Sequence, residues 1–165
     1  MAYEFYIAVE GTKQGKFKGE SKREKWKEQI TGLSYAHKIQ SPRDIATGQA
    51  SGKRQHGAIS ITKEWGPSTP QLFTALVSNE VLKKVEFSFV HTTKEGAEEV
   101  YQTVKLTNAT VSAVEYMTGV GDSAESAKHT GAFDTHELEK VSFTYQRIEV
   151  DNLPGKTSAV DDWTL

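Results

Sequence analysis

The chain has 165 residues, enough for one domain with a substantial core, and 36% of them are hydrophobic and 25% charged, as in ordinary soluble proteins. A net charge of −2 predicts no general attraction to nucleic acid or to an anionic membrane, and the absence of cysteine excludes disulfides and thiolate metal sites. Because no apolar run is long enough for a membrane span and residues 1–4 do not start a signal peptide, we expect a single domain over residues 1–165 without membrane or nucleic-acid partners.

The first third of the chain alternates apolar and polar residues, the period of two that is typical of half-buried strands. This pattern predicts strands over residues 3–9, 33–39 and 57–65. Residues 20–28 have a helix-forming composition but no apolar stripe, so we expect no stable helix there.

Residues 41–56 contain proline, clusters of small residues and one large apolar side chain, which predicts a long loop. Connections of this length are usually functional or disordered. The composition allows polar contacts with a neighbouring copy around one apolar anchor, while the frequent glycine and serine also fit a disordered excursion. The candidate contact residues are Arg43, Asp44, Ile45, Lys53 and Arg54.

One helix is predicted, over residues 69–77. Thr69 can cap its first turn, and Pro70 follows where its missing N–H does no harm. Four apolar residues fall on one side of this helix, which we expect to pack on a sheet. They are Leu72, Phe73, Leu76 and Val77.

The second half of the chain returns to the strand pattern. Residues 85–91 alternate, and residues 98–117 form an unusually long extended run whose apolar parity changes near Asn108. A bulge there, and a second near residues 146–147, would explain the changes and would bend the sheet. The glycine-rich residues 119–134 predict an exposed loop.

We count about seven strands and one helix, so the predicted fold is mainly β: a compact two-sheet β-barrel flanked by the helix at 69–77. Several strands carry semi-apolar side chains on both faces, for example Tyr6, Ala8 and Tyr101. A second covered face is therefore expected, supplied by the helix in a monomer or by a neighbouring subunit in an oligomer.

Charge is unevenly distributed along the chain. Residues 13–27 carry seven lysines or arginines against two glutamates, whereas Asp151, Asp161 and Asp162 make the C-terminal end acidic. Either both segments are solvated, or opposite charges meet between copies of the chain.

No residue spacing predicts catalysis or a bound ion. Residues 48–54 resemble a phosphate-binding loop but are one residue short and precede a predicted strand, not a helix. The five histidines lack metal-ligand spacing, and residues 32–36 lack the last glycine of a nucleophile elbow. We therefore expect no enzymatic activity, no metal and no cofactor.

The order of several segments resembles the Hcp family, the tube proteins of bacterial type VI secretion. The matching segments are GES at 19–21 before Trp26, GAISITKEW at 57–65, TPQLFTALVSNEVLKKVEFSF at 69–89, VSFTYQRIEV at 141–150 and TSAVDDWTL at 157–165. The sequence differs from the family pattern at 66–69 and at 79–80, which affects only the entry and exit of the helix.

The resemblance implies a structural protein that forms homohexameric rings, which stack into the inner tube of a contractile machine. It implies partners as well: the spike protein, the contractile sheath and small effectors held in the ring lumen. The tube protein would be made in the cytoplasm and secreted without a signal peptide. Residues 41–56 would then be an extended arm at ring contacts.

Two other classes of function remain open on the sequence. A small-ligand-binding β-barrel without catalytic activity would need a deep apolar interior and a mobile mouth, for which residues 119–134 are a candidate. A single-strand nucleic-acid binder could use the basic residues 13–27 with Trp26, although such platforms carry several exposed aromatic side chains.

Overall fold

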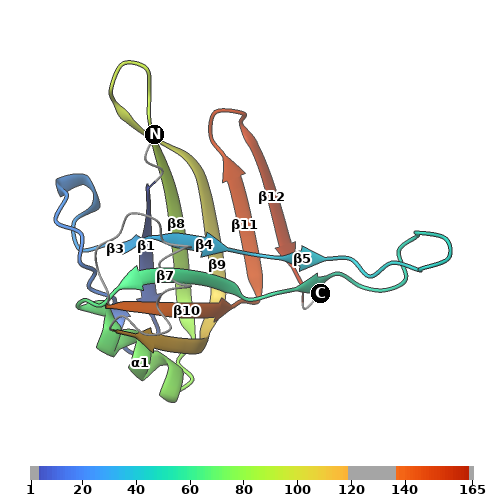
Figure 1. Ribbon diagram of the computed structural model, residues 1–165, viewed down its shortest axis with the longest axis horizontal. Coiled ribbons are helices and arrows are strands. Elements are labelled where there is room, and N and C mark those ends of the chain that lie inside the picture. Colours follow the sequence, from blue (N-terminus) through green and yellow to red (C-terminus); the bar gives the residue numbers. More distant parts are fainter. Residues whose placement is uncertain (1–3, 119–136, 164–165) are drawn as a thin grey trace.

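The computed structural model describes residues 4–118 and 137–163 of the chain, and the loop predicted at 119–134 lies outside them (Figure 1). The described fold is mainly β with one α-helix, as the sequence predicts. Its strands are β1 Glu4–Gly11, β2 Gly15–Lys16, β3 Ile30–Gly32, β4 Ser34–Ala36, β5 Ile39–Gln40, β6 Gln55–His56, β7 Ile59–Glu64, β8 Leu82–Thr92, β9 Glu98–Met117, β10 Leu138–Thr144, β11 Arg147–Asn152 and β12 Thr157–Asp162. The helices are the 3₁₀ turn η1 Glu24–Trp26 and α1 Ser68–Val77.

Two antiparallel sheets share the 20-residue strand β9. Sheet A contains β2, β3, β1, β8, the first part of β9, β11 and β12, and sheet B contains the second part of β9, β10, β7 and β4. Residues 30–36 connect the two sheets a second time, because β3 pairs with β1 of sheet A and β4 pairs with β7 of sheet B. The predicted two-sheet architecture is confirmed, and most of the strands beyond the predicted seven are only two or three residues long.

The chain changes sheet at the two places where the apolar parity changes. Asn108 has a φ of 51°, in the left-handed region, and lies between the buried residues Leu106 and Ala109. Here β9 passes from sheet A to sheet B. At residues 145–146 β10 ends before β11 begins, so the second predicted bulge is a passage of the chain back to sheet A.

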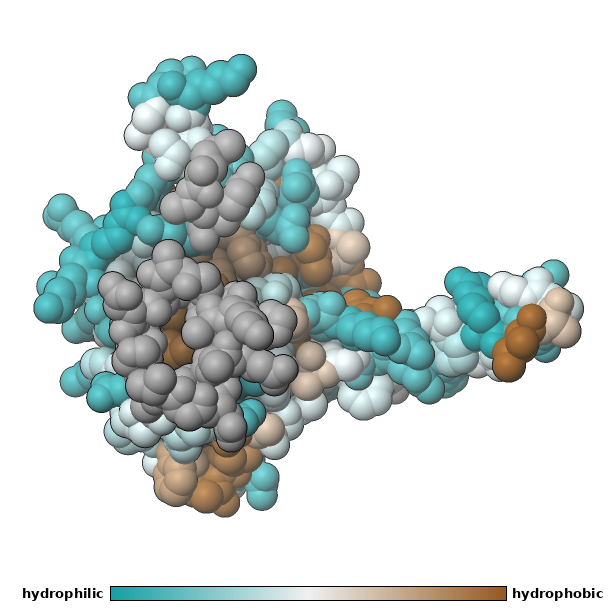
Figure 2. Space-filling view, viewed as in Figure 1, coloured by the Kyte–Doolittle hydropathy of each residue, from teal (hydrophilic) through white to brown (hydrophobic). Residues whose placement is uncertain are grey.

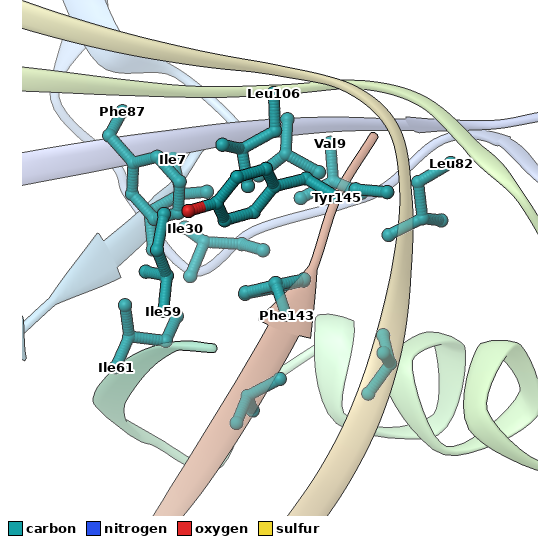
Figure 3. Packing of buried hydrophobic residues seen from close by; sticks show 14 of the residues in the cluster. Ile7, Val9, Ile30, Ile59, Ile61, Leu82, Phe87, Leu106, Phe143 and Tyr145 are labelled. Atoms are coloured by element: carbon teal, nitrogen blue, oxygen red, sulfur yellow. The ribbon is translucent and has the colours of Figure 1, made fainter. Parts of the chain in front are cut away.

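Side chains from both sheets and from α1 fill the interior (Figure 3). Ile59, Phe87 and Phe143 are fully buried there, and burying each such side chain stabilises the fold by about 1.5–3 kcal/mol. A second cluster lies on the other face of β1, where Tyr6 stacks on Trp26 at a ring distance of 4.9 Å. The sequence leaves open whether the helix or a neighbouring subunit covers Tyr6. In the structure Trp26 of the same chain covers it.

The helix packs through a narrower stripe than the sequence predicts. Leu72 and Ala75 are buried and Leu76 is partly buried against the core, as predicted for Leu72 and Leu76, whereas Phe73 is 52% and Val77 64% exposed. The predicted cap is also wrong: Pro67 is the N-cap, and the Thr69 hydroxyl instead accepts a hydrogen bond from the Gly66 N–H at 3.0 Å. Because a helix turns about 100° per residue, the contact face at i, i+3 and i+4 leaves the positions beside it in solvent.

Strand β7 places a charged residue in the core. Lys63 continues the inward parity of Ile59 and Ile61, and its ammonium lies 2.6 Å from Oε1 of Glu139 with both side chains fully buried. Trp65, which has the same parity as Ile59 and Ile61, lies beyond the end of β7 and is part-exposed. A buried charge is tolerated here because its partner is buried beside it.

Candidate functional site: the arm and its base

Residues 39–56 form a two-stranded arm that projects from the body of the molecule, and not an unpaired loop (Figure 1 and Figure 2). At its base β5 pairs antiparallel with β6, and the Gly57 N–H donates to the Lys38 carbonyl at 2.9 Å. Further out, Arg43 and Ala50 form an isolated antiparallel bridge. Backbone pairing along its length gives the arm a defined direction.

The tip of the arm is a closed turn built on Asp44. Its carboxylate Oδ1 accepts hydrogen bonds from the N–H groups of Ala46 at 2.7 Å and Thr47 at 3.1 Å. Gly48 has a φ of 71°, and its N–H donates to the Asp44 carbonyl at 2.8 Å. Asp44 therefore shapes the turn, and the turn presents the Ile45 side chain fully exposed to solvent.

Arg54, at the base of the arm, binds an aspartate of its own chain. Its guanidinium makes two hydrogen bonds to the Asp161 carboxylate, at 2.6 and 2.7 Å, and a third to the Asp162 carbonyl at 3.0 Å. From the sequence, the basic residues of this segment are expected to contact a neighbouring copy, at its acidic C-terminal end or at its glutamates in residues 95–99. For Arg54 the contact is within one chain, while Arg43 and Lys53 are exposed along the arm.

A chain of side-chain hydrogen bonds extends from Asp161 under the arm. His56 Nε2 lies 2.7 Å from Asp161 Oδ2, and its Nδ1 lies 2.8 Å from the Tyr145 hydroxyl. The same hydroxyl lies 2.6 Å from His37 Nε2, and the Trp163 indole N–H donates to the Tyr145 carbonyl. His37 lies just before β5, and His56 lies in β6. The network therefore ties both strands of the arm to β12 and to the end of β10.

Three groups of the network, Asp161, His37 and Tyr145, have shifted pKa values. Hydrogen bonds from Arg54 and then from His56 lower the pKa of Asp161, which stays ionised. Burial lowers the pKa of His37, with a smaller contribution from His56, and burial raises the pKa of Tyr145 to about 12. Since an ionised Asp161 carboxylate can only accept hydrogen bonds, His56 Nε2 donates to it, and the Tyr145 hydroxyl joins the facing nitrogens of His37 and His56.

Sequence reasoning placed Arg54 at a contact site but missed the residues that hold it. His37, His56 and Tyr145 were treated as ordinary strand or loop residues, because their spacing matches no motif. Arg54 and Asp161 are 107 positions apart, so no local pattern connects them. The available signal was compositional: an arginine at the base of a long loop and an acidic C-terminal end.

In the described ranges, no group of three or more histidine, cysteine or acidic residues is arranged to hold a metal ion. Among the described helices, none is both long enough and apolar enough to cross a membrane.

Comparison with known proteins identifies a family. The family model described as "Type VI secretion system effector, Hcp" matches residues 6–151. A "Major exported protein" of Pseudomonas aeruginosa is 34% identical over 173 aligned residues, which cover 99% of this chain and 96% of that protein.

Solved structures agree with this match. A crystal structure of an Hcp protein superposes with a TM-score of 0.86 at 29% identity, covering 98% of each chain. The Hcp1 protein of the E. coli EAEC 042 pathovar, a mutant form, gives a TM-score of 0.83 at 25% identity and covers 98% of this chain and 99% of that one. The secreted protein Hcp3 of Pseudomonas aeruginosa gives 0.75 at 26% identity, again covering 98% and 99%.

Proposed function

Since the chain belongs to the Hcp family of type VI secretion proteins, we propose that it is a structural subunit of the inner tube, which forms homohexameric rings that stack. The tube is secreted through the type VI system, and its lumen carries small effectors. The spike protein and the contractile sheath are its other partners. The subunit is made in the cytoplasm and needs no signal peptide, and its role requires no catalysis and no cofactor.

One observation carries the proposal: a backbone-paired arm ends in a closed turn that presents an exposed isoleucine. Exposure of the apolar Ile45 side chain to water is unfavourable. Its position is not needed to close the turn, because the backbone N–H groups there already donate to the Asp44 carboxylate. A pre-ordered element of this kind loses little conformational entropy on binding, which favours contact with another copy. Arg43 and Lys53 supply polar contacts around this apolar anchor.

The experiment replaces Arg43, Ile45 and Lys53 together by serine and leaves Arg54 in place. We expect the fold and the ring to persist while stacked tubes and secreted protein are lost, because these three side chains are exposed and make no contact that holds the body together. Electron microscopy of the purified protein and an immunoblot of the culture medium measure the two outcomes.

A matched control replaces Val77, Lys83 and Lys140, also one apolar and two basic exposed residues, by serine. It should stack and be secreted like the unmodified chain. Normal secretion of the arm variant would overturn the contact role of the arm, and a purified protein that stays monomeric would overturn the ring.

The alternative function, a β-barrel that binds a small ligand in its interior, has less support. The space between the described parts of the two sheets is filled by side chains such as Ile59, Phe87 and Phe143, none of which is accessible to solvent (Figure 3). A ligand site of that kind requires a cavity lined by such residues.

A further inference from the structure

Residues 19–29, which contain η1, form a loop whose two ends are hydrogen-bonded to each other. The Gly19 N–H donates to the Glu28 carbonyl at 2.6 Å, and the Ser21 N–H donates to the Gln29 carbonyl at 3.1 Å. Gly19 allows this close approach, because a Cβ at its position would lie 2.1 Å from the carbonyl carbon of Gln29. The GES segment of the sequence therefore closes this loop, a role separate from the proposed contacts of the arm.

The 19–29 loop is attached to both sheets. On sheet A the attachment is Trp26, which stacks on β1. Toward sheet B the attachment is the carboxyl group of Glu20. Its buried Oε2 lies beside Gly66, where a Cβ would be 3.1 Å away, and its Oε1 accepts a hydrogen bond from the Thr31 N–H at 3.2 Å. Glu20 therefore places its carboxyl group between the loop and the turn that connects β7 to α1.

This attachment brings two carboxyl groups to one ammonium group. Among the described residues, the charged groups that act on the Glu20 carboxyl are the Lys63 ammonium of β7 and the Glu139 carboxylate of β10. The ammonium is already used, since it lies 2.6 Å from Glu139 Oε1 and donates to the Glu64 carbonyl at 2.5 Å. An ionised Glu20 therefore leaves one negative charge without a counter-charge in a buried place, which is unfavourable.

The charges outside do not supply the missing counter-charge. A cleft of about 540 Å³ adjoins Glu20, and its lining carries two further acidic and two basic side chains, all exposed. They are Glu4, Glu64, Lys22 and Arg23. Arg23 is paired with Glu4 and Glu98. The rim of the cleft is therefore balanced in charge.

The hydrogen bonds of the attachment also favour a proton on Glu20. Within the described part of the chain, Glu20 Oε2, Glu139 Oε2 and Ser68 Oγ are buried without a hydrogen-bond partner. An ionised carboxylate only accepts hydrogen bonds, whereas a protonated one also donates. Burial raises the pKa of Glu20, and the Lys63 ammonium and the Thr31 N–H lower it by less. A proton on Glu20 removes the surplus charge and adds a donor.

We propose that Glu20 makes the 19–29 loop a proton-controlled closure, docked on sheet B when the carboxyl group is protonated and released when it is ionised. Docking is strongest below the ordinary pKa of Glu20 and weakens as the pH rises through the raised pKa of the docked loop. Release also loosens the stack of Trp26 on sheet A. The closure acts within one chain and does not depend on the assembly of rings.

Amide hydrogen exchange of the whole chain tests the closure. The probes are the N–H groups of Ser21, Glu28 and Thr31, which are bonded only while the loop is closed. After correction for the intrinsic pH dependence of exchange, their opening should increase at least about threefold from about pH 4 to about pH 7.5, the factor for half a pKa unit. The neutral variant Glu20→Gln should show no such increase and should be less open than the unmodified chain at about pH 7.5.

A matched control, Glu64→Gln, removes an exposed carboxylate from the rim of the same cleft and should keep the pH dependence of the unmodified chain. Carboxyl-carbon NMR of the unmodified chain gives a second measurement that needs no variant. The Glu20 signal should titrate with a midpoint above the ordinary 4.5, together with the opening of the loop. A midpoint at or below 4.5 would overturn the proposal. So would a Glu20→Gln loop that is more open than the unmodified one at about pH 7.5, because the ionised carboxylate would then be the form that holds the loop.

Discussion

The buried ion pair between Lys63 and Glu139 offers a sharp test of the packing of sheet B. Both side chains have no solvent exposure, and the Glu139 carboxylate also accepts a hydrogen bond from the Thr69 hydroxyl at 3.0 Å. Lys63→Met keeps the length and apolar stem of the side chain but leaves the carboxylate without its counter-charge. Removing one partner of a buried pair costs about 3–5 kcal/mol. At a urea m-value of about 2 kcal/mol/M, the unfolding midpoint should fall by about 1.5–2.5 M.

The double variant Lys63→Met, Glu139→Leu separates the cost of leaving one charge unpaired from the net contribution of the ion pair to the free energy of unfolding. Replacing both charges by apolar groups removes the desolvation cost of each, so the double variant should recover at least half of the loss. Urea unfolding at one fixed protein concentration measures all three proteins, because assembly adds to the apparent stability. A loss below about 1 kcal/mol for Lys63→Met alone would mean that water reaches the pair, contrary to the packing described here.

Two further predictions concern the helix and the arm base. Leu72→Ala should cost about 2–5 kcal/mol in the free energy of unfolding and Phe73→Ala less than about 1 kcal/mol, and equal losses in urea unfolding would contradict the contact stripe of α1. Because the pKa of His37 is lowered, its contribution to stability is full above its ordinary pKa of 6.5 and declines as the pH falls below that value. Acidification to about pH 5 should therefore speed amide exchange in residues 41–56. The variant His37→Gln should reduce this effect. For Asp161, whose lowered pKa starts from 3.8, the contribution is full above that value and is lost only as the pH falls through the lowered pKa, so at pH 5 it should be unchanged.

Local periodicity was sufficient to predict the main strands. Residues 3–9, 57–65 and 98–117 alternate because one face of each meets the core, and the parity change at Asn108 correctly predicted where β9 bends. Lys63 was missed because a single sequence places a lysine outside by default, and only the distant Glu139 explains its burial.

The arm was predicted as a candidate contact, but its internal order was not. A long polar segment has the composition of a flexible loop, and the pairing of Ile39 with His56 joins residues that no short-range rule connects. The turn at Asp44 uses a side-chain contact that sequence alone allows at many aspartates. The base depends on Asp161, which lies in β12, a strand that the sequence did not predict.

Strand β12 connects the arm to sheet A. Asp161 of β12 holds the arm through Arg54 and His56, while the strand itself pairs with β11 of sheet A. Any contact that restrains β12 would therefore also restrain the direction of the arm through Asp161. A restrained arm loses less conformational entropy when it binds another copy. The pairing of β12 with β11 in this way favours the contact proposed for the arm.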